Sequence, residues 1–257
     1  MDDIITAVEG QCATVTINRP RRRNAMTMSM WKAIPGIMKD LEADGRVRAI
    51  LLTGAQGNFC AGADIAEFGE LRATEAQADS YEEAVNACCD AVFSVSKPTI
   101  AAVDGYCLGG GCHLAMSCDF RYAGAGAVFG IPAARLSIVY GVSGTAKLLA
   151  LVGLANAKRI LYGGESLTAE EALRIGLADG LFDDPAAAAT AFAQKLEESA
   201  PLTISGSKSI LNGLAMGPGA LDPDVAARAI RKAIHSADYR EGRAAFAGKR
   251  PPRFRGR

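Results

Sequence analysis

The chain has 257 residues, of which 49% are hydrophobic and 22% are charged, as is ordinary for a globular protein. Its 28 basic residues balance its 28 acidic residues, which argues against a nucleic-acid-binding protein. No apolar stretch is long and charge-free enough to cross a membrane, and the N-terminus lacks the features of a signal peptide, so we expect a cytoplasmic location.

The first half of the chain is predicted to alternate short strands with helices. Strands are expected at residues 4–8, 13–18, 47–53, 99–103 and 120–123, the first two joined as a hairpin. Thr27 or Ser29 is expected to cap a helix that runs to about Leu41, in which Pro35 predicts a kink or a late start. Further helices are expected at residues 80–94 and 112–117, with a short one after Ala63.

The second half is predicted to be mainly helical. Residues 168–171 form a capping box for a helix that Gly176 ends, and Asp184 with Pro185 starts another helix through about Glu198. Pro201 then separates a last helical stretch. We therefore expect a core of residues 1–200, followed by a helical segment of residues 201–257. The rhythm of strand, strand and helix favours an α/β spiral over a doubly wound sheet.

The seven cysteines and two histidines predict no metal site. The cysteine count is odd, and neither zinc-type pair spacing nor a histidine cluster occurs. We expect free, buried thiols in a reducing compartment.

Two glycine-rich segments, residues 58–65 and 104–115, carry the strongest chemical signal. Each follows an apolar strand and leads into a predicted helix, and neither matches a nucleotide-binding loop or a nucleophile elbow. Turns built of glycine and alanine leave backbone N–H groups unpaired. Two such turns facing each other could stabilise charge that develops on one oxygen, as an oxyanion hole does. Tight turns that need glycine for conformation alone explain the segments equally well.

These segments resemble the two signature motifs of the enoyl-CoA hydratase/isomerase (crotonase) superfamily, and the resemblance covers most of the chain. Residues 19–26 resemble its first coenzyme A contact, residues 129–132 the strand that carries a second catalytic side chain, and residues 238–250 its C-terminal segment. The resemblance implies a crotonase-like spiral of ββα units with a C-terminal helical layer. It also implies assembly through that layer as a homotrimer or a dimer of trimers.

The resemblance also implies a set of site residues. Ala63 and Gly110 match the two oxyanion-hole amides. Positions at or beside the contacts to the substrate, some of them supplied by a neighbouring subunit, are Arg21, Ala25, Ala61, Asp64, Ile65, Phe246 and Lys249. A solvated arginine remains the alternative for Arg21, and a packing residue for Phe246. The implied substrate is an acyl-CoA thioester, with coenzyme A as part of the substrate and no separate cofactor.

The chain departs from the hydratase pattern at both catalytic carboxylates. The pattern has one Glu after the Gly-Gly-Gly-Cys run and another after Phe-Gly-x-Pro, where this chain has His113 and Ala133. Alanine cannot transfer a proton, so two-carboxylate hydration is in doubt. His113, whose ordinary pKa suits acid–base work, and Tyr140 are the remaining candidates for handling or orienting a proton, although either could be a packing residue.

We therefore predict an acyl-CoA enzyme that stabilises a thioester enolate, and a lyase or isomerase of the enoyl-CoA hydratase/isomerase family. Two alternatives stay open. A malonyl-type acyl-CoA decarboxylase needs the oxyanion hole without the carboxylate pair, and an acyl-CoA-binding subunit needs no catalytic group. No membrane or nucleic-acid partner is expected.

Overall fold

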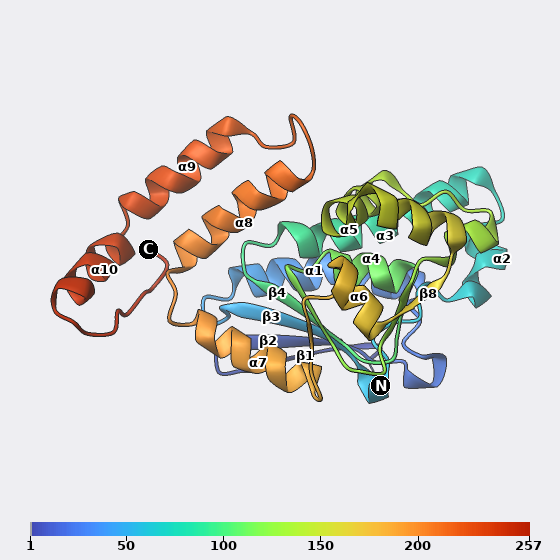
Figure 1. The fold of residues 1–257 in the computed structure, drawn as a ribbon, viewed down its shortest axis with the longest axis horizontal. Coiled ribbons are helices and arrows are strands. Elements are labelled where there is room, and N and C mark those ends of the chain that lie inside the picture. Colours follow the sequence, from blue (N-terminus) through green and yellow to red (C-terminus); the bar gives the residue numbers. More distant parts are fainter. Residues whose placement is uncertain (1) are drawn as a thin grey trace.

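The computed structural model describes residues 2–257, so Met1, the first residue of the predicted core, lies outside it. The largest sheet in these residues has six strands in the order β1-β2-β3-β4-β6-β9 (Figure 1). β1 and β2 form the predicted antiparallel hairpin, and all other neighbours in this sheet are parallel. The strands are β1 (Ile4–Glu9), β2 (Cys12–Ile17), β3 (Ala49–Gly54), β4 (Thr99–Val103), β6 (Phe120–Ala123) and β9 (Gly180–Leu181).

A second sheet continues from the strands of the first. Its three strands are β5 (Tyr106–Leu108), β7 (Val128–Gly130) and β8 (Ser166–Thr168). The chain passes from β4 into β5 through Asp104 and Gly105, and from β6 into β7 through residues 124–127. β4 and β5 lead into α4 (Gly110–Met116), a succession of two strands and a helix that fits the predicted rhythm, although β5 itself was not predicted.

Alternate residues of the central strands pack into two different layers. Ile50 and Leu52 belong to the core shared with α1 (Met28–Ala43) and α3 (Glu75–Ser94). Leu51 and Ile100 instead pack against α7 (Pro185–Leu196). Figure 1 shows α7 below the strands and α1 above them. Because the sheet is covered on both faces, successive positions in the middle of such a strand are apolar, which explains the apolar run at residues 49–52.

The helices correct the sequence prediction at two places. α1 begins at Met28, where Thr27 Oγ1 accepts a hydrogen bond from Met30 N at 3.4 Å, so the late start predicted from Pro35 is wrong. Buried Trp31 and other apolar side chains offset the hydrogen bond that this proline removes. α3 begins earlier than predicted because Thr74 and Gln77 form a capping box. That polar first turn is invisible to hydrophobic periodicity.

Two further helices follow the sequence prediction more closely: one is ended by a glycine and the other is capped by an aspartate. α6 (Ala169–Ile175) ends at Gly176, whose φ of 83° gives a left-handed cap. Thr168 caps the start of α6, but the Glu171 carboxylate pairs with Arg159 rather than completing the predicted box. Asp184 caps α7 by accepting a hydrogen bond from Ala187 N at 2.9 Å.

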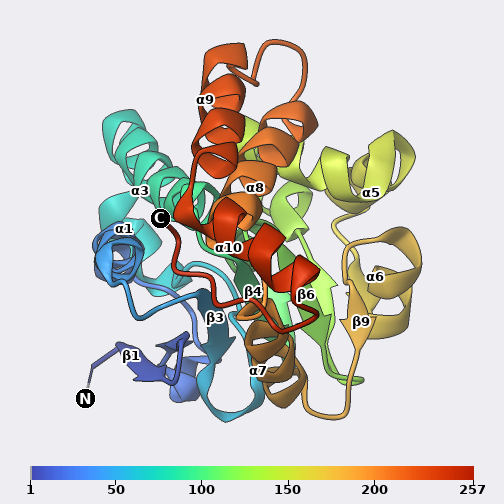
Figure 2. The same ribbon diagram turned by 90° about the vertical axis from the view of Figure 1, so that its left-hand side faces the viewer.

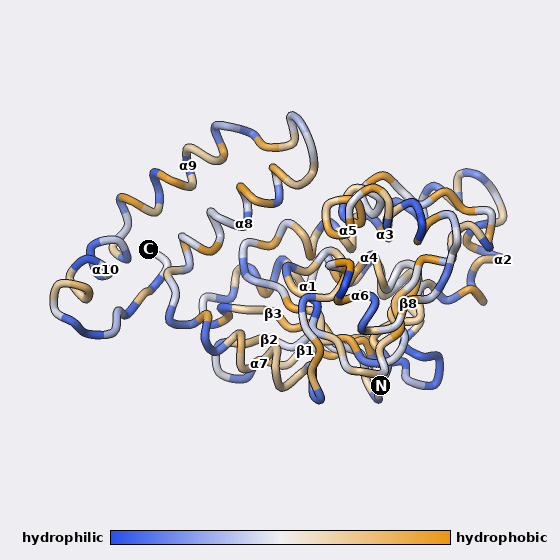
Figure 3. Tube along the Cα trace, in the orientation of Figure 1, coloured by the Kyte–Doolittle hydropathy of each residue, from blue (hydrophilic) through white to orange (hydrophobic). Residues whose placement is uncertain are grey.

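The last three helices project from the rest of the chain (Figure 1). They are α8 (Pro201–Ala215), α9 (Pro223–Ile234) and α10 (Ala237–Ala247), so the predicted helical segment begins where α8 begins. Figure 2 shows them between α1 and α3 on one flank and α5 (Val142–Gly163) and α6 on the other. Several of their apolar side chains are exposed, namely Leu211, Leu214, Ile230, Ile234 and Phe246. Figure 3 shows that hydrophobic and hydrophilic positions alternate along α8 and α9. Within residues 2–257, no helix has the length and apolar content to span a bilayer.

Candidate active site

The two glycine-rich segments meet at the start of α4. Cys60 N donates a hydrogen bond to Tyr106 O at 2.8 Å, and Leu108 N donates one to Cys60 O at 3.0 Å. A methyl group on Gly110 would lie 4.0 Å from the amide nitrogen of Ala63. Across residues 2–257, the N–H groups of Ala63 and Gly110 donate to no protein acceptor. Two backbone donors are thus close together and available.

The close approach of the two glycine-rich segments requires glycine at particular positions. Gly62 has a φ of 102° and Gly109 a φ of 52°, values that side chains other than glycine rarely adopt. A methyl group on Gly111 would lie 2.4 Å from the carbonyl oxygen of Cys60. The glycines therefore serve both the turn conformation and the close contact between the segments.

The loop of residues 19–26 is hydrogen-bonded to the first glycine-rich segment, residues 58–65. Ala61 N donates to Arg23 O at 3.0 Å, and Met26 N donates to Gly62 O at 2.8 Å. The Arg19 guanidinium lies 2.9 Å from the Asp64 carboxylate and also donates to Ala25 O at 2.6 Å. Arg19 was not among the predicted site residues, yet it joins the two loops.

Five of the predicted substrate-binding residues come together here, namely Arg21, Ala25, Ala61, Asp64 and Ile65. Arg21 lies in a short 3-10 turn, Pro20–Arg22, and is exposed, as is Ile65. Partial burial works against the charge on Asp64, but hydrogen bonds from Arg19 and the amide of Ala66 hold its pKa below the ordinary value. The Asp64 carboxylate therefore stays ionised and accepts its hydrogen bonds from within the protein, from Arg19 and Ala66 N.

Trp31 of α1 forms a rigid wall beside Gly110. Its ring is fully buried, and two of its carbons would lie 3.1 Å from a methyl group placed on Gly110. The indole Nε1 donates to the Tyr81 hydroxyl at 3.1 Å. Burial raises the pKa of Tyr81 to about 12, so this hydroxyl stays protonated.

His113 and Tyr140 lie close to each other beside α4. The ring centroids lie 5.7 Å apart, and the Tyr140 hydroxyl donates to Gly109 O at 3.2 Å. The phenol therefore contacts the peptide group that carries the Gly110 N–H, on the side opposite to that N–H because the peptide is trans. Burial raises the pKa of Tyr140 well above its ordinary value, so the hydroxyl keeps its proton. His113 is 3% exposed and lies deeper.

The positions of the two missing carboxylates are both buried. Ala133 follows β7 in a 3-10 turn, Pro132–Leu136, and no ionisable side chain stands there. Beside His113, Asp90 of α3 pairs with Lys147 of α5 at 2.8 Å, and Lys147 Nζ lies 3.5 Å from His113 Nε2. Sequence reasoning missed Lys147, although a lysine directly before the apolar run of residues 148–152 is a usable signal.

Cysteines beside the site are buried, as predicted. Cys60 and Cys112 have no exposed surface. Burial raises the pKa of Cys60 to about 12, so its thiol is protonated at neutral pH and is not a nucleophile.

Phe246 and Lys249 lie elsewhere in the chain. Phe246 is on α10, at the opposite end of the molecule from α2 (Phe68–Leu71), which follows the first glycine-rich segment (Figure 1). Its side chain is 88% exposed. The fold of one chain therefore does not bring these two residues to the amides of Ala63 and Gly110.

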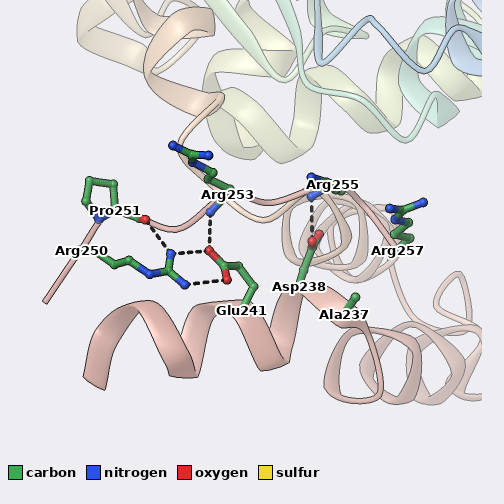
Figure 4. A pocket seen from close by; sticks show the side chains of 8 residues that line it. All are labelled: Ala237, Asp238, Glu241, Arg250, Pro251, Arg253, Arg255 and Arg257. Carbon is green, nitrogen blue, oxygen red and sulfur yellow. Dashed lines mark hydrogen bonds and ion pairs between the residues drawn. The ribbon is translucent and has the colours of Figure 1, made fainter. Parts of the chain in front are cut away.

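The C-terminal tail beyond α10 is clasped against that helix (Figure 4). Glu241 accepts hydrogen bonds from the Arg250 guanidinium at 2.6 and 2.9 Å and from Arg253 N at 2.9 Å. Asp238 accepts from Arg255 N and Gly256 N, each at 2.7 Å. Two carboxylates thus hold the tail.

Replacing Glu241 with glutamine is expected to free the tail and to speed tryptic cleavage after Arg253. Hydrogen bonding from Arg250 lowers the pKa of Glu241 to about 2. The clasp is therefore complete at neutral pH and is lost only as the pH falls toward that value. Limited proteolysis followed by mass spectrometry measures the cleavage. The exposed Glu83→Gln is the control, and equal cleavage of both variants would contradict the clasp.

The comparisons with known proteins agree with this architecture. A solved enoyl-CoA hydratase from Bacillus anthracis superposes with a TM-score of 0.91 at 29% identity, covering 100% of both chains. An enoyl-CoA hydratase/carnithine racemase from Magnetospirillum magneticum gives 0.93 at 34% identity, covering 100% of this chain and 97% of its own. The structure is therefore a crotonase-type α/β spiral with a helical C-terminal region.

Sequence similarity narrows this class to a family. The family profile described as enoyl-CoA hydratase/isomerase matches residues 7–257. A short-chain-enoyl-CoA hydratase from Clostridium acetobutylicum is 38% identical over 215 residues, which are 82% of each chain. The chain belongs to the enoyl-CoA hydratase/isomerase family.

Proposed function

We propose that this protein is an acyl-CoA enzyme, a lyase or isomerase, that stabilises a thioester enolate between the amides of Ala63 and Gly110. The observation that carries the proposal is the pair of adjacent N–H groups that donate to no acceptor in the described chain. Such donors polarise the thioester carbonyl and stabilise the negative charge that moves onto its oxygen when a bond at the α-carbon breaks. Because the loops are fixed by their own hydrogen bonds, the donors need little reorganisation.

The coenzyme A part of the substrate is proposed to lie along the loops that Arg19 joins. Arg21 is exposed there and could pair with a phosphate, while Ala25, Ala61 and Ile65 offer small or apolar contacts to pantetheine. Asp64 serves mainly to hold Arg19. Coenzyme A is then part of the substrate, and no separate cofactor is needed.

Assembly into a homotrimer or a dimer of trimers is proposed from the exposed apolar side chains of α8–α10. In such an assembly Phe246 and Lys249 would reach the substrate of a neighbouring subunit, which their position within one chain does not allow. The cytoplasm remains the expected location.

Decarboxylation of a malonyl-type acyl-CoA is the second candidate reaction. It is favoured by the absence of an ionisable group at Ala133 and by Tyr140, a protonated phenol beside Gly110. Loss of CO₂ leaves its electron pair on the α-carbon, so the reaction needs the two amides and a proton donor but no base. Acyl-CoA binding without turnover is the third candidate.

Incubation with crotonyl-CoA and, separately, with methylmalonyl-CoA distinguishes these candidates when each thioester is followed by mass. Gain of water by crotonyl-CoA supports hydration, and loss of CO₂ from methylmalonyl-CoA supports decarboxylation. Tight binding of both esters without a change in mass, extended to a broad panel of acyl groups, supports the binding subunit. Absence of binding to every ester would contradict the proposal as a whole.

A further inference from the structure

A buried lysine lies behind the proposed site and has no part in the proposed chemistry. Lys147 of α5 is charged, yet its side chain is only 2% exposed. Its Nζ lies 2.8 Å from Asp90 Oδ1, 2.9 Å from Ser143 Oγ and 3.5 Å from His113 Nε2. A buried ammonium is stable only when its hydrogens have acceptors, so these three contacts need to be accounted for together.

The hydrogen-bond pattern around Lys147 favours one assignment of donors and acceptors. An ammonium has three N–H donors and no acceptor. Ser143 Oγ donates its own hydrogen to Asp90 Oδ1 at 2.7 Å, so toward Lys147 this oxygen must accept. The Asp90 carboxylate also accepts. The third N–H of Lys147 is therefore directed at His113 Nε2.

An imidazole nitrogen that accepts a hydrogen bond carries a lone pair and no proton. In a neutral histidine one ring nitrogen is the donor and the other the acceptor, so the proton of His113 is left on Nδ1. The opposite ring orientation would set a C–H group against Lys147. One hydrogen of the buried ammonium would then face no lone pair, and the Phe93 ring, whose centroid lies 5.0 Å from Nζ, is a weaker partner than a ring nitrogen.

We propose that Lys147 is a positioning residue that fixes His113 as the Nδ1–H tautomer. This assignment rests on the proposed function, and it gives the two candidate proton-handling residues, His113 and Tyr140, different roles. Nε2 of His113 is occupied by Lys147 and does not accept a proton from the substrate. His113 can act only as an N–H donor through Nδ1, which leaves Tyr140 as the group that transfers a proton.

Nitrogen NMR tests the tautomer directly, since the chain has only two histidines. His235→Gln leaves His113 as the single imidazole. At about pH 8, where an ordinary histidine is neutral, long-range nitrogen–proton correlation is expected to show a protonated Nδ1 and an unprotonated Nε2. A protonated Nε2 would overturn the assignment. Because no substrate is added, the result is independent of whether the proposed reaction is correct.

Lys147→Met in the same background removes the donor, and the Nδ1–H form is then expected to give way to a mixture that contains Nε2–H. Lys158→Met, an exposed lysine of the same helix, is the matched control and should leave the spectrum unchanged. An unchanged tautomer in folded Lys147→Met protein would overturn the positioning role. If that variant does not fold, the spectrum of the His235→Gln protein still decides the assignment.

Discussion

Substitution of Gly110 with alanine is expected to lower kcat by about 10²–10³-fold, the effect of losing one oxyanion-hole donor. The added methyl group would lie 3.1 Å from two ring carbons of Trp31, which is buried and hydrogen-bonded to Tyr81. The ring has little freedom to move away, so the start of α4 must shift instead. That shift moves the Gly110 amide relative to the Ala63 amide. Steady-state kinetics with whichever thioester is turned over measures the loss.

Gly36→Ala provides the matched control for this experiment. Gly36 is exposed on α1, the helix that carries Trp31, and a methyl group there would meet nothing within 4 Å. Alanine is the better helix former, so this variant should be at least as stable as the parent and keep its kcat. Equal kcat for both variants would exclude an oxyanion hole at Gly110.

Removal of the Tyr140 hydroxyl, as Tyr140→Phe, is expected to lower kcat by about 10²-fold or more, the usual contribution of a positioned proton donor. KM should change little, because the phenylalanine ring keeps the packing against His113 and loses only the bond to Gly109 O. Tyr162→Phe is the control, since Tyr162 is 74% exposed on α5. A kcat that is retained in Tyr140→Phe would assign the tyrosine to packing alone.

The pH dependence of kcat gives a second measure of the same group. Burial raises the pKa of Tyr140 well above its ordinary value of 10.0. The donor is the protonated form, which is present below the pKa and lost as the pH rises through it. No decline of kcat assignable to this tyrosine is therefore expected up to about pH 10. A decline centred near pH 8 or 9 that disappears in Tyr140→Phe would contradict a proton donor of raised pKa.

The expected phenotypes separate two kinds of contribution to catalysis. In the proposed function, the amides of Ala63 and Gly110 stabilise charge on the carbonyl oxygen, whereas Tyr140 transfers a proton. Since the chain has His113 and Ala133 where the hydratase pattern has carboxylates, no second carboxylate is available to compensate at those positions. A hydratase activity in this chain would have to use other groups, of which the described residues offer Tyr140 at the start of α4.

Local patterns in the sequence determined the larger elements. The strand predicted at residues 47–53 corresponds to β3, whose residues 49–52 are apolar because both faces of the strand are covered, and Asp184 before Pro185 predicted the start of α7. The short strands β7 and β8 were not predicted from periodicity, because three residues are too few to show a repeat. The late start of α1 predicted from Pro35 is wrong, because packing along α1 outweighs the local preference of proline.

For the candidate site, too, the sequence determined some features and the tertiary structure decided others. Sequence by itself indicated the two glycine-rich turns, in which Gly62 with a φ of 102° and Gly109 with a φ of 52° and a ψ of -116° have backbones that favour glycine, and it showed that His113 and Ala133 replace carboxylates. Only the tertiary structure decided that Lys147 meets Asp90 and that Arg19 meets Asp64, because these pairs come from elements far apart in the chain. Their contacts depend on how helices and loops pack, and burial then decides which charged side chains must find partners.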